Sequence, residues 1–263
     1  MVRMRTKGMM MLLLLLPLHS ALAAPAEGTG KTFPGGTSDK EVAQLIHAMM
    51  DDQYGAANYN TKYNCWDIEL QPTGGLSTQY CMKPGPSQLI SESGATALYV
   101  LSYNRDDIAG DPDYSYSHSD LGLMGAFKAV HDDKTDQWAY VAGNRAMDYG
   151  TGGSCGCADA ELIAIGANRH GWVFTTGGSW QGTLVLNYAI VTDFDGKFFN
   201  VSAIPHIKEE SQDVEYDVHV AGGRQNQAMF PLIVTKTKAG KKVEDITVPF
   251  DASKRIYALP EGK

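Results

Sequence analysis

Basic residues are scarce in this sequence, with 22 lysines and arginines against 30 aspartates and glutamates and a formal net charge of −8. Nucleic acids and anionic lipid surfaces are bound through basic faces, because these neutralise phosphate charge. The composition therefore argues against a nucleic-acid or anionic-lipid partner. It is compatible with a cationic partner, or with a protein or glycan of the cell envelope.

Long apolar runs are missing too, apart from one at the N-terminus. There MMMLLLLLPL follows a basic segment and precedes Ala21-Leu22-Ala23. A basic start, a short apolar stretch and a small-residue site are typical of a cleaved secretory signal peptide. A membrane anchor would need about 20 uninterrupted apolar residues, and Pro17 breaks this run. The sequence thus predicts a Sec-type signal peptide over residues 1–23, cut after Ala23, and a periplasmic or secreted protein that does not span the membrane after cleavage.

Cysteine is sparse as well, with four residues: Cys65, Cys81, Cys155 and Cys157. An even number in an exported chain predicts two disulfides, and export argues against a free catalytic thiol. Cys65 and Cys81 flank a strand–turn–strand pattern with Gly74-Gly75 at its tip, which favours their pairing. A Cys155–Cys157 bond would close a very small, strained ring. Crossing both of these thiols to Cys65 and Cys81 therefore stays an alternative.

Helical patterning is confined to one clear segment. Ser38 and Glu41 fit a capping box, in which the two side chains satisfy each other's backbone amides. The apolar residues that follow at helical spacing are Val42, Leu45, Ile46 and Met49. Residues 24–37, before this helix, are rich in Gly, Pro and Thr and are expected to form a flexible leader.

After about residue 54 the chain consists of short runs rich in Val, Ile, Tyr and Phe, separated by turn residues. Hairpin turns are predicted at residues 131–136, Arg169-His170-Gly171, Asp195-Gly196 and Ala239-Gly240-Lys241; Asp-Gly is the strongest, since it fits a type I′ turn. The run ADAELIAIGA fits either a strand or a helix. We therefore expect an all-β fold, a mainly antiparallel meander of sandwich or barrel type, with one N-terminal α-helix and disulfide staples, forming a single domain over residues 38–263.

Several short segments are similar to a known group of proteins. They are Gly171-Trp172-Val173, Gln181-Gly182, residues 188–191, Asp195-Gly196-Lys197, His118-Ser119-Asp120 and residues 122–127. Over about residues 118–205 the chain resembles a group of uncharacterised, secreted, β-rich proteobacterial proteins. The resemblance implies an exported β-rich fold. It carries neither an activity nor site residues.

The stretch Gly152-Gly153-Ser154-Cys155-Gly156 matches G-x-S-x-G, the nucleophile elbow of α/β-hydrolases. Asp193 or Asp195, then His206 or His219, would supply the acid and the base in chain order. However, the elbow requires alternating strands and helices, and this chain offers hairpins. Ser154 and His118 are therefore weak catalytic candidates. The C-x-C motif lacks the second ligand pair that a zinc site needs.

A second candidate site is the acidic loop over residues 104–120. Its carboxylates are Asp106, Asp107, Asp111, Asp113 and Asp120. Calcium binds six to eight oxygen ligands in flexible loops, so the first four of these are weak calcium candidates, and calcium is the only cofactor that the sequence suggests. Their spacing does not fit an EF-hand. The alternative is a solvated loop whose aspartates cap turns.

Tyr54, Tyr59, Tyr63 and Trp66 form an aromatic run, and further aromatic residues are Tyr114, Tyr116, Trp172 and Trp180. Such residues bind sugars or proteins when exposed, but they are also ordinary strand residues. Carboxylate pairs for glycosidase chemistry cannot be placed from sequence. The sequence favours an exported binding or inhibitory protein of the cell envelope, of the effector-neutralising kind among others, without catalytic activity. The alternatives are a secreted hydrolase that uses Ser154 or a carboxylate pair, and a calcium-stabilised structural module.

Overall fold

The computed structural model describes residues 30–70, 77–223 and 226–262. The expected signal peptide and the Gly74-Gly75 turn lie outside these residues. Among the described helices, none combines the length and the apolar character needed to cross a membrane.

Helix α1 (Asp39–Tyr54) begins at the predicted capping box: the Ser38 side chain accepts from the Glu41 amide, and the Glu41 carboxylate accepts from the Ser38 amide. Leu45 and Met49 are buried as their spacing predicts. The two short 3-10 helices are η1 (Ala56–Asn58) and η2 (Pro112–Tyr114).

Part of the segment that we expected to be a flexible leader is paired with the first sheet. Residues Thr32–Pro34 form strand β1, which pairs with the strand that contains Trp138. Phe33 is buried and belongs to the core that underlies α1. Burial of Phe33 and backbone pairing with the strand that contains Trp138 both oppose the entropy of ordering this segment. The leader prediction is therefore wrong for these three residues.

The N-terminal half of the chain forms a seven-stranded antiparallel sheet. Its order is β1-β7-β6-β5-β4-β3-β2. The strands after β1 are β2 (Tyr59–Asn60), β3 (Cys65–Leu70), β4 (Thr78–Glu92), β5 (Ala95–Asn104), β6 (Gly122–Asp132) and β7 (Gln137–Tyr149).

The C-terminal half forms a second sheet of nine strands, whose main path is β15-β14-β13-β12-β10-β9-β8. Strand β11 pairs with β10, and β16 pairs in parallel with β12. The strands are β8 (Glu161–Gly166), β9 (Arg169–Trp180), β10 (Thr183–Phe194), β11 (Lys197–Asn200), β12 (Ser202–Lys208), β13 (Ser211–Val220), β14 (Leu232–Lys238), β15 (Lys241–Val248) and β16 (Tyr257–Ala258).

Three of the predicted hairpin turns are confirmed, at residues 131–136, Asp195-Gly196 and Ala239-Gly240. Asp195 and Gly196 both have positive φ, as a type I′ turn requires. The turn expected at Arg169-His170-Gly171 is wrong, because these residues belong to β9 and the chain reverses at Ala167-Asn168. Asn168 takes a positive φ of 54°, which asparagine tolerates well. The ambiguous run before it contains strand β8.

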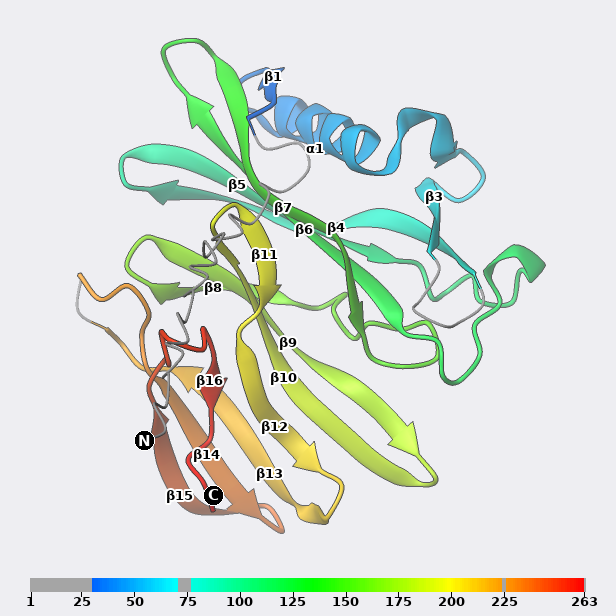
Figure 1. The fold of residues 1–263 in the computed structure, drawn as a ribbon. Coiled ribbons are helices and arrows are strands. Elements are labelled where there is room, and N and C mark those ends of the chain that lie inside the picture. The colour runs from blue at the N-terminus through cyan, green and yellow to red at the C-terminus, as the bar shows by residue number, and fades with distance from the viewer. Residues whose placement is uncertain (1–29, 71–76, 224–225, 263) are drawn as a thin grey trace, which may run out of the picture.

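The two sheets lie on top of each other, with α1 on the outer face of the first (Figure 1). One core lies between α1 and the seven-stranded sheet, and it includes Met49, Trp66 and Phe127. A second core joins the two sheets, with Tyr99 from the first against Trp172 and Phe198 from the second. A third core is formed by residues of the C-terminal strands, among them Ile204, Leu232 and Val248. The predicted all-β class with one helix is confirmed.

Two disulfides are formed, Cys65–Cys81 and Cys155–Cys157. The first joins the start of β3 to β4, where Cys65 lies two positions along the strand from Asp67, the register partner of Cys81. This bond confirms the favoured pairing. The second closes the C-x-C loop on itself, so the alternative that crossed the two pairs is wrong. Gly156 makes this small ring feasible, since it takes a positive φ of 68° and passes close to the Thr175 carbonyl.

Candidate functional site

Strand β4 has a free edge over its second half. Strand β3 pairs with Thr78–Met82 only, and beyond Met82 the described residues place no strand on that side of β4. The register to β5 shifts between Pro84 and Ser87, because Pro84-Gly85-Pro86 interrupts the pairing of the two strands. Proline donates no backbone hydrogen bond and is confined to sheet edges or bulges. From Ser87 to Glu92 the strand is then paired with β5 alone.

The hairpin geometry shows which backbone groups face away from β5. Ser93 and Gly94 form a two-residue turn with φ values of 51° and 81°, which is typical of a type I′ hairpin. The flanking Glu92–Ala95 pair is then hydrogen-bonded, and hydrogen-bonded pairs alternate along the strand. The N–H and C=O groups of Ser87, Leu89 and Ser91 therefore point outward. The described residues provide no strand or loop backbone as their partner.

Helix α1 lies beside this edge and leaves a groove of about 360 Å³. We call it the α1–β4 groove, and its lining residues are Asp39, Val42, Ala43, Ile46, Ser87, Gln88, Leu89 and Leu98. The four helical residues follow the i, i+3, i+4, i+7 spacing that places side chains on one helix face. Leu89 lies opposite the buried Leu98 of β5 and is 41% exposed. The groove therefore combines an apolar wall with unpaired strand backbone.

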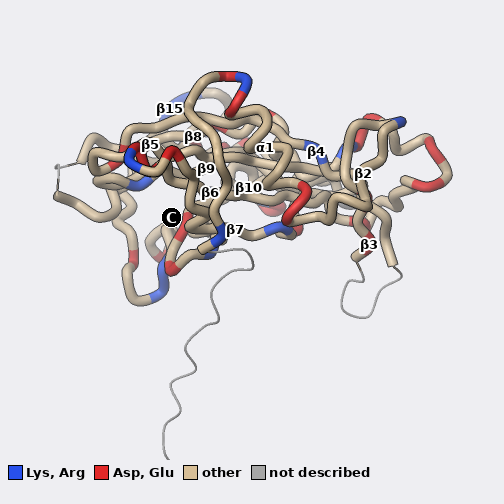
Figure 2. Tube along the Cα trace, turned by 90° about the horizontal axis from the view of Figure 1, so that it is seen from above, with Lys and Arg blue, Asp and Glu red and all other residues tan. Residues whose placement is uncertain are grey.

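Charge in the groove is limited to one carboxylate. Asp39, in the first turn of α1, is the only charged side chain of its lining. Elsewhere on the described chain, basic and acidic residues are interspersed (Figure 2). A second hollow of about 560 Å³ lies on the adjacent side of α1 and shares Ala43 with the groove. His47 is one of its lining residues, and the His47 ring also contacts the rings of Tyr59 and Trp66 at centroid distances of 5.2 and 4.9 Å.

A buried ionic cluster fixes the end of β4. Glu92 Oε2 lies 2.7 Å from Lys128 Nζ of β6, and Glu92 Oε1 lies 2.6 Å from His170 Nδ1 of β9. The Tyr99 hydroxyl donates to Glu92 Oε1 at 2.7 Å, and Lys128 Nζ lies 4.7 Å from the Tyr99 ring centre. Thr192 of β10 donates to the His170 carbonyl. The cluster joins both sheets through one carboxylate.

The surroundings of Glu92 favour its ionised form. Burial alone would raise the pKa of this carboxyl, but hydrogen bonds from His170, Lys128 and Tyr99 lower the pKa to about 2. Burial and the same carboxylate raise the pKa of the Tyr99 hydroxyl well above its usual value. Glu92 is thus a fixed anion at neutral pH. It ties the tip of the β4–β5 hairpin to β9 and so holds the free edge of β4 in place.

Ser154 does not lie in a nucleophile elbow. It is half-buried in the loop that joins strands β7 and β8, where its amide donates to the Thr151 carbonyl. Among the described residues, no histidine is hydrogen-bonded to its hydroxyl. His118 Nε2 lies 2.8 Å from the Ser179 carbonyl, and Asp195 pairs with Arg255. In the described part of the chain, Ser154 therefore has no hydrogen-bonded histidine to activate it, and the alternative of a carboxylate pair stays a prediction.

Three carboxylates of the acidic loop have other partners, and the first of them, Asp120, accepts from the Ser117 amide at 2.6 Å. Asp107 forms an ion pair with Arg105, and Asp111 accepts hydrogen bonds from Tyr63 and Lys62. Asp106 and Asp113 are both exposed at the surface. The only described group of three metal-ligating side chains is Cys65, Asp67 and Cys81, and its two sulfurs form a disulfide. The calcium hypothesis stays a prediction.

Most of the aromatic residues singled out in the sequence lie in the cores. Tyr54, Trp66, Tyr114 and Trp172 are buried, and Tyr116 stacks on Tyr80 at a centroid distance of 5.6 Å. The Tyr54 hydroxyl lies 2.8 Å from Ser102 Oγ and donates to the Arg145 carbonyl, so it ties α1 to the sheet.

Comparison with family models, curated proteins and solved structures gave no match for this chain. The similarity of residues 118–205 to secreted β-rich proteins stays a prediction.

Proposed function

We propose that this protein is an exported binding protein of the cell envelope, without catalytic activity, that captures an extended segment of a partner protein in the α1–β4 groove. The observation that carries the proposal is the free edge of β4. Ser87, Leu89 and Ser91 direct unpaired backbone groups outward beside an apolar helix face. Extended peptides bind such edges by adding a strand to the sheet.

The groove favours a particular kind of segment. Backbone hydrogen bonds to β4 would supply affinity for any extended chain, and alternate side chains of that chain would face α1. One of these side chains would meet Val42, Ile46 and Leu89, which favours an apolar residue. Asp39 favours a lysine or arginine beside it. The preferred partner is thus an extended segment with an apolar residue next to a basic one.

The free edge of β4 is held rigidly at both ends, which supports binding of an extended peptide. Glu92 fixes one end of the free segment through its buried ion pairs, and the Cys65–Cys81 disulfide joins β3 to β4 just before the other end. A pre-organised edge loses little conformational entropy when a peptide binds. A protein of this kind inhibits its partner when the captured segment belongs to the partner's active region. Effector neutralisation is one such use.

Leu89→Glu is expected to weaken binding of a groove ligand at least 10-fold, because it places a charge in the apolar wall. The ligands are ten-residue peptides selected on the wild-type protein from a displayed library. Leu121→Glu is the matched control, since Leu121 is 40% exposed and does not line the groove. The affinity of each selected peptide is measured by fluorescence anisotropy with both variants.

A twofold change or less is expected for Leu121→Glu. Equal affinity of the selected peptides for the two variants, or failure of the library to yield any binder, would contradict the proposed function. Both substitutions are at exposed sites, where the expected change in stability is within about 0.5 kcal/mol. Thermal unfolding of the two variants checks this.

A further inference from the structure

A further cavity lies on the nine-stranded sheet, away from α1. Its volume is about 470 Å³, and three separate segments line it: the end of β10, the loop before β14 and the segment after β15. The lining residues are Phe194, Gln227, Ala228, Met229, Pro249, Phe250, Ala252 and Arg255. The size is sufficient for a small organic molecule.

Flat aromatic rings form one wall of this cavity. The rings of Phe194 and Phe250 are nearly parallel, with an interplanar angle of 7° and a centroid distance of 5.9 Å. Phe199 stacks on Phe194 from β11 at 5.4 Å. All three rings are only partly buried, although each could contribute about 1.5–3 kcal/mol by full burial. Stacked rings that remain open to a cavity offer a surface for a planar or apolar group.

Two guanidinium groups lie against the ring of Phe194. The Cζ atom of Arg169 is 4.0 Å from the ring centre of Phe194, and that of Arg255 is 5.5 Å from it. Arg169 donates to the Asp193 carbonyl, which fixes its position behind the wall. Arg255 lines the cavity itself. Positive charge and aromatic surface therefore meet at one place in an acidic protein.

Arg255 can accept a further anion. Its described ion pair joins Nη2 to Asp195 at 2.8 Å, and the Asp195 side chain is 71% exposed. Guanidinium carries five N–H donors, so this pair leaves several for another ligand. An ion pair open to water contributes little, and a bound anion could share or replace it at small cost.

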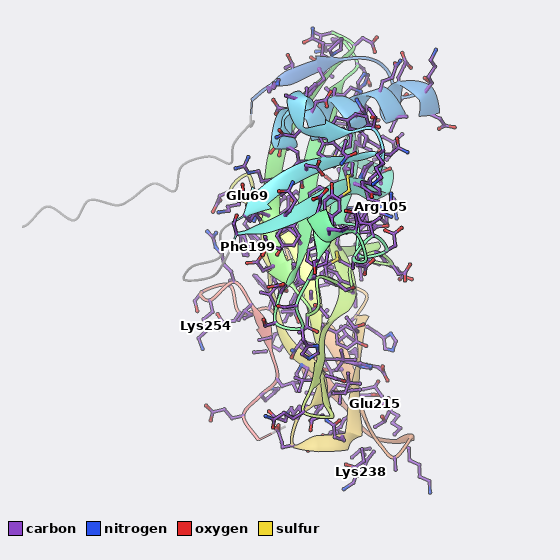
Figure 3. All side chains as sticks on the ribbon, turned by 90° about the vertical axis from the view of Figure 1, so that its right-hand side faces the viewer. Glu69, Arg105, Phe199, Glu215, Lys238 and Lys254 are labelled. Carbon is purple, nitrogen blue, oxygen red and sulfur yellow. A yellow bond between two sulfur atoms is a disulfide. The ribbon has the colours of Figure 1, made fainter. Side chains whose placement is uncertain are left out.

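The loop that carries Arg255 is well fixed. Asp251 and Ile256 exchange two backbone hydrogen bonds, at 2.9 and 3.2 Å. The Asp251 carboxylate accepts from the amides of Ser253 and Lys254, and these bonds close the turn between Asp251 and Ile256. Figure 3 labels Lys254 in this loop and Phe199, both on the same side of the molecule. The guanidinium is thus held on a short, internally bonded loop.

We propose that this cavity binds a small amphipathic anion, with a flat apolar body against Phe194 and Phe250 and its acidic group on Arg255. The site is separate from the α1–β4 groove, so this proposal does not depend on peptide capture in that groove. The ligand class is an aromatic or apolar carboxylate or sulfonate, because only such a molecule uses both halves of the site.

The probe is 8-anilinonaphthalene-1-sulfonate, an aromatic anion whose fluorescence rises in apolar surroundings. Arg255→Gln is expected to weaken its binding about 10-fold. Lys254→Gln is the matched control: it also removes one positive charge from the same loop, but Lys254 does not line the cavity. Its expected effect is less than twofold. Ala252→Trp, which adds a large side chain to the lining of the cavity, should remove binding.

Neutral N-phenyl-1-naphthylamine separates the two halves of the site, since it keeps the apolar body and lacks the sulfonate. It is expected to bind the wild-type protein at least 10-fold more weakly than the sulfonate. Equal loss in Arg255→Gln and Lys254→Gln would overturn the proposal, since general attraction of the anion explains it. Absence of sulfonate binding to the wild-type protein, or full binding to Ala252→Trp, would overturn it as well. Circular dichroism of each variant confirms the fold.

Discussion

Glu92→Gln is expected to lower the free energy of unfolding by about 3 kcal/mol near neutral pH, because it leaves a buried lysine without its counter-ion. Glu92 and Lys128 are both nine-tenths buried, and Lys128 Nζ lies 2.7 Å from the carboxylate. The glutamine oxygen can still accept from His170 and Tyr99, but its NH2 group, in place of Oε2, cannot accept from Lys128. Urea unfolding followed by circular dichroism measures the change.

The double variant Glu92→Gln with Lys128→Met is the control for this explanation. It removes the unpaired charge, so at least half of the lost stability should return. If the double variant is no more stable than Glu92→Gln, the loss does not come from the uncompensated charge. A loss below about 1 kcal/mol in the single variant would show that the cluster does not hold the sheets together.

The stability difference between the wild-type protein and Glu92→Gln is expected to depend on pH. The pKa of Glu92 is about 2 in the folded protein and about 4.3 for an unperturbed glutamate. A carboxyl whose pKa is lower in the folded protein stabilises the fold fully at pH values above its pKa in the unfolded chain. This contribution disappears as the pH falls towards its pKa in the folded protein. At pH 3, about 2 kcal/mol of the stability that Glu92 contributes at neutral pH should be lost. The difference between wild type and Glu92→Gln should therefore shrink on acidification.

Removal of the Cys65–Cys81 disulfide is expected to cost about 3 kcal/mol, because this bond closes a 16-residue separation in the unfolded chain. The variant is Cys65→Ala with Cys81→Ala, which leaves no buried hydroxyl. Both sulfurs are fully buried beside Tyr114, so lost packing adds to the loss. The measurement is denaturant unfolding of the oxidised wild-type protein and of the variant.

Cys155→Ala with Cys157→Ala provides the comparison. The two residues are separated by only two positions, so loop closure accounts for about 1.5 kcal/mol. The account predicts that the Cys65–Cys81 variant is the less stable of the two. The opposite order would mean that the C-x-C loop, and not the β3–β4 staple, organises the fold.

Local sequence patterns were sufficient for much of this fold. The capping box at Ser38 and Glu41 predicts the start of α1, since both partners lie within four residues. Asp195-Gly196 predicts its hairpin for the same reason. The turn at Ala167-Asn168 was missed because Arg169-His170-Gly171 offers a glycine nearby, and pairing of His170 with β8 decides the position.

The candidate site depends on relations that sequence does not show. Whether Ser87–Ser91 has a free edge depends on where β3 ends opposite β4, which is a property of the sheet register. Pro84-Gly85-Pro86 is the available signal, since prolines are rare in central strands. The approach of Glu92 to His170 joins residues 78 positions apart, and no local pattern predicts it.

Amide hydrogen exchange at the free edge of β4 tests the central claim most directly. The measurement compares the protein alone with the protein saturated by a library-selected peptide. The account predicts that exchange slows at least 10-fold at Ser87, Leu89 and Ser91, whose N–H groups face outward. Gln88 and Ile90, which are already bonded to β5, should change much less. Saturation by the peptide without slower exchange at Ser87, Leu89 and Ser91 would contradict capture by strand addition.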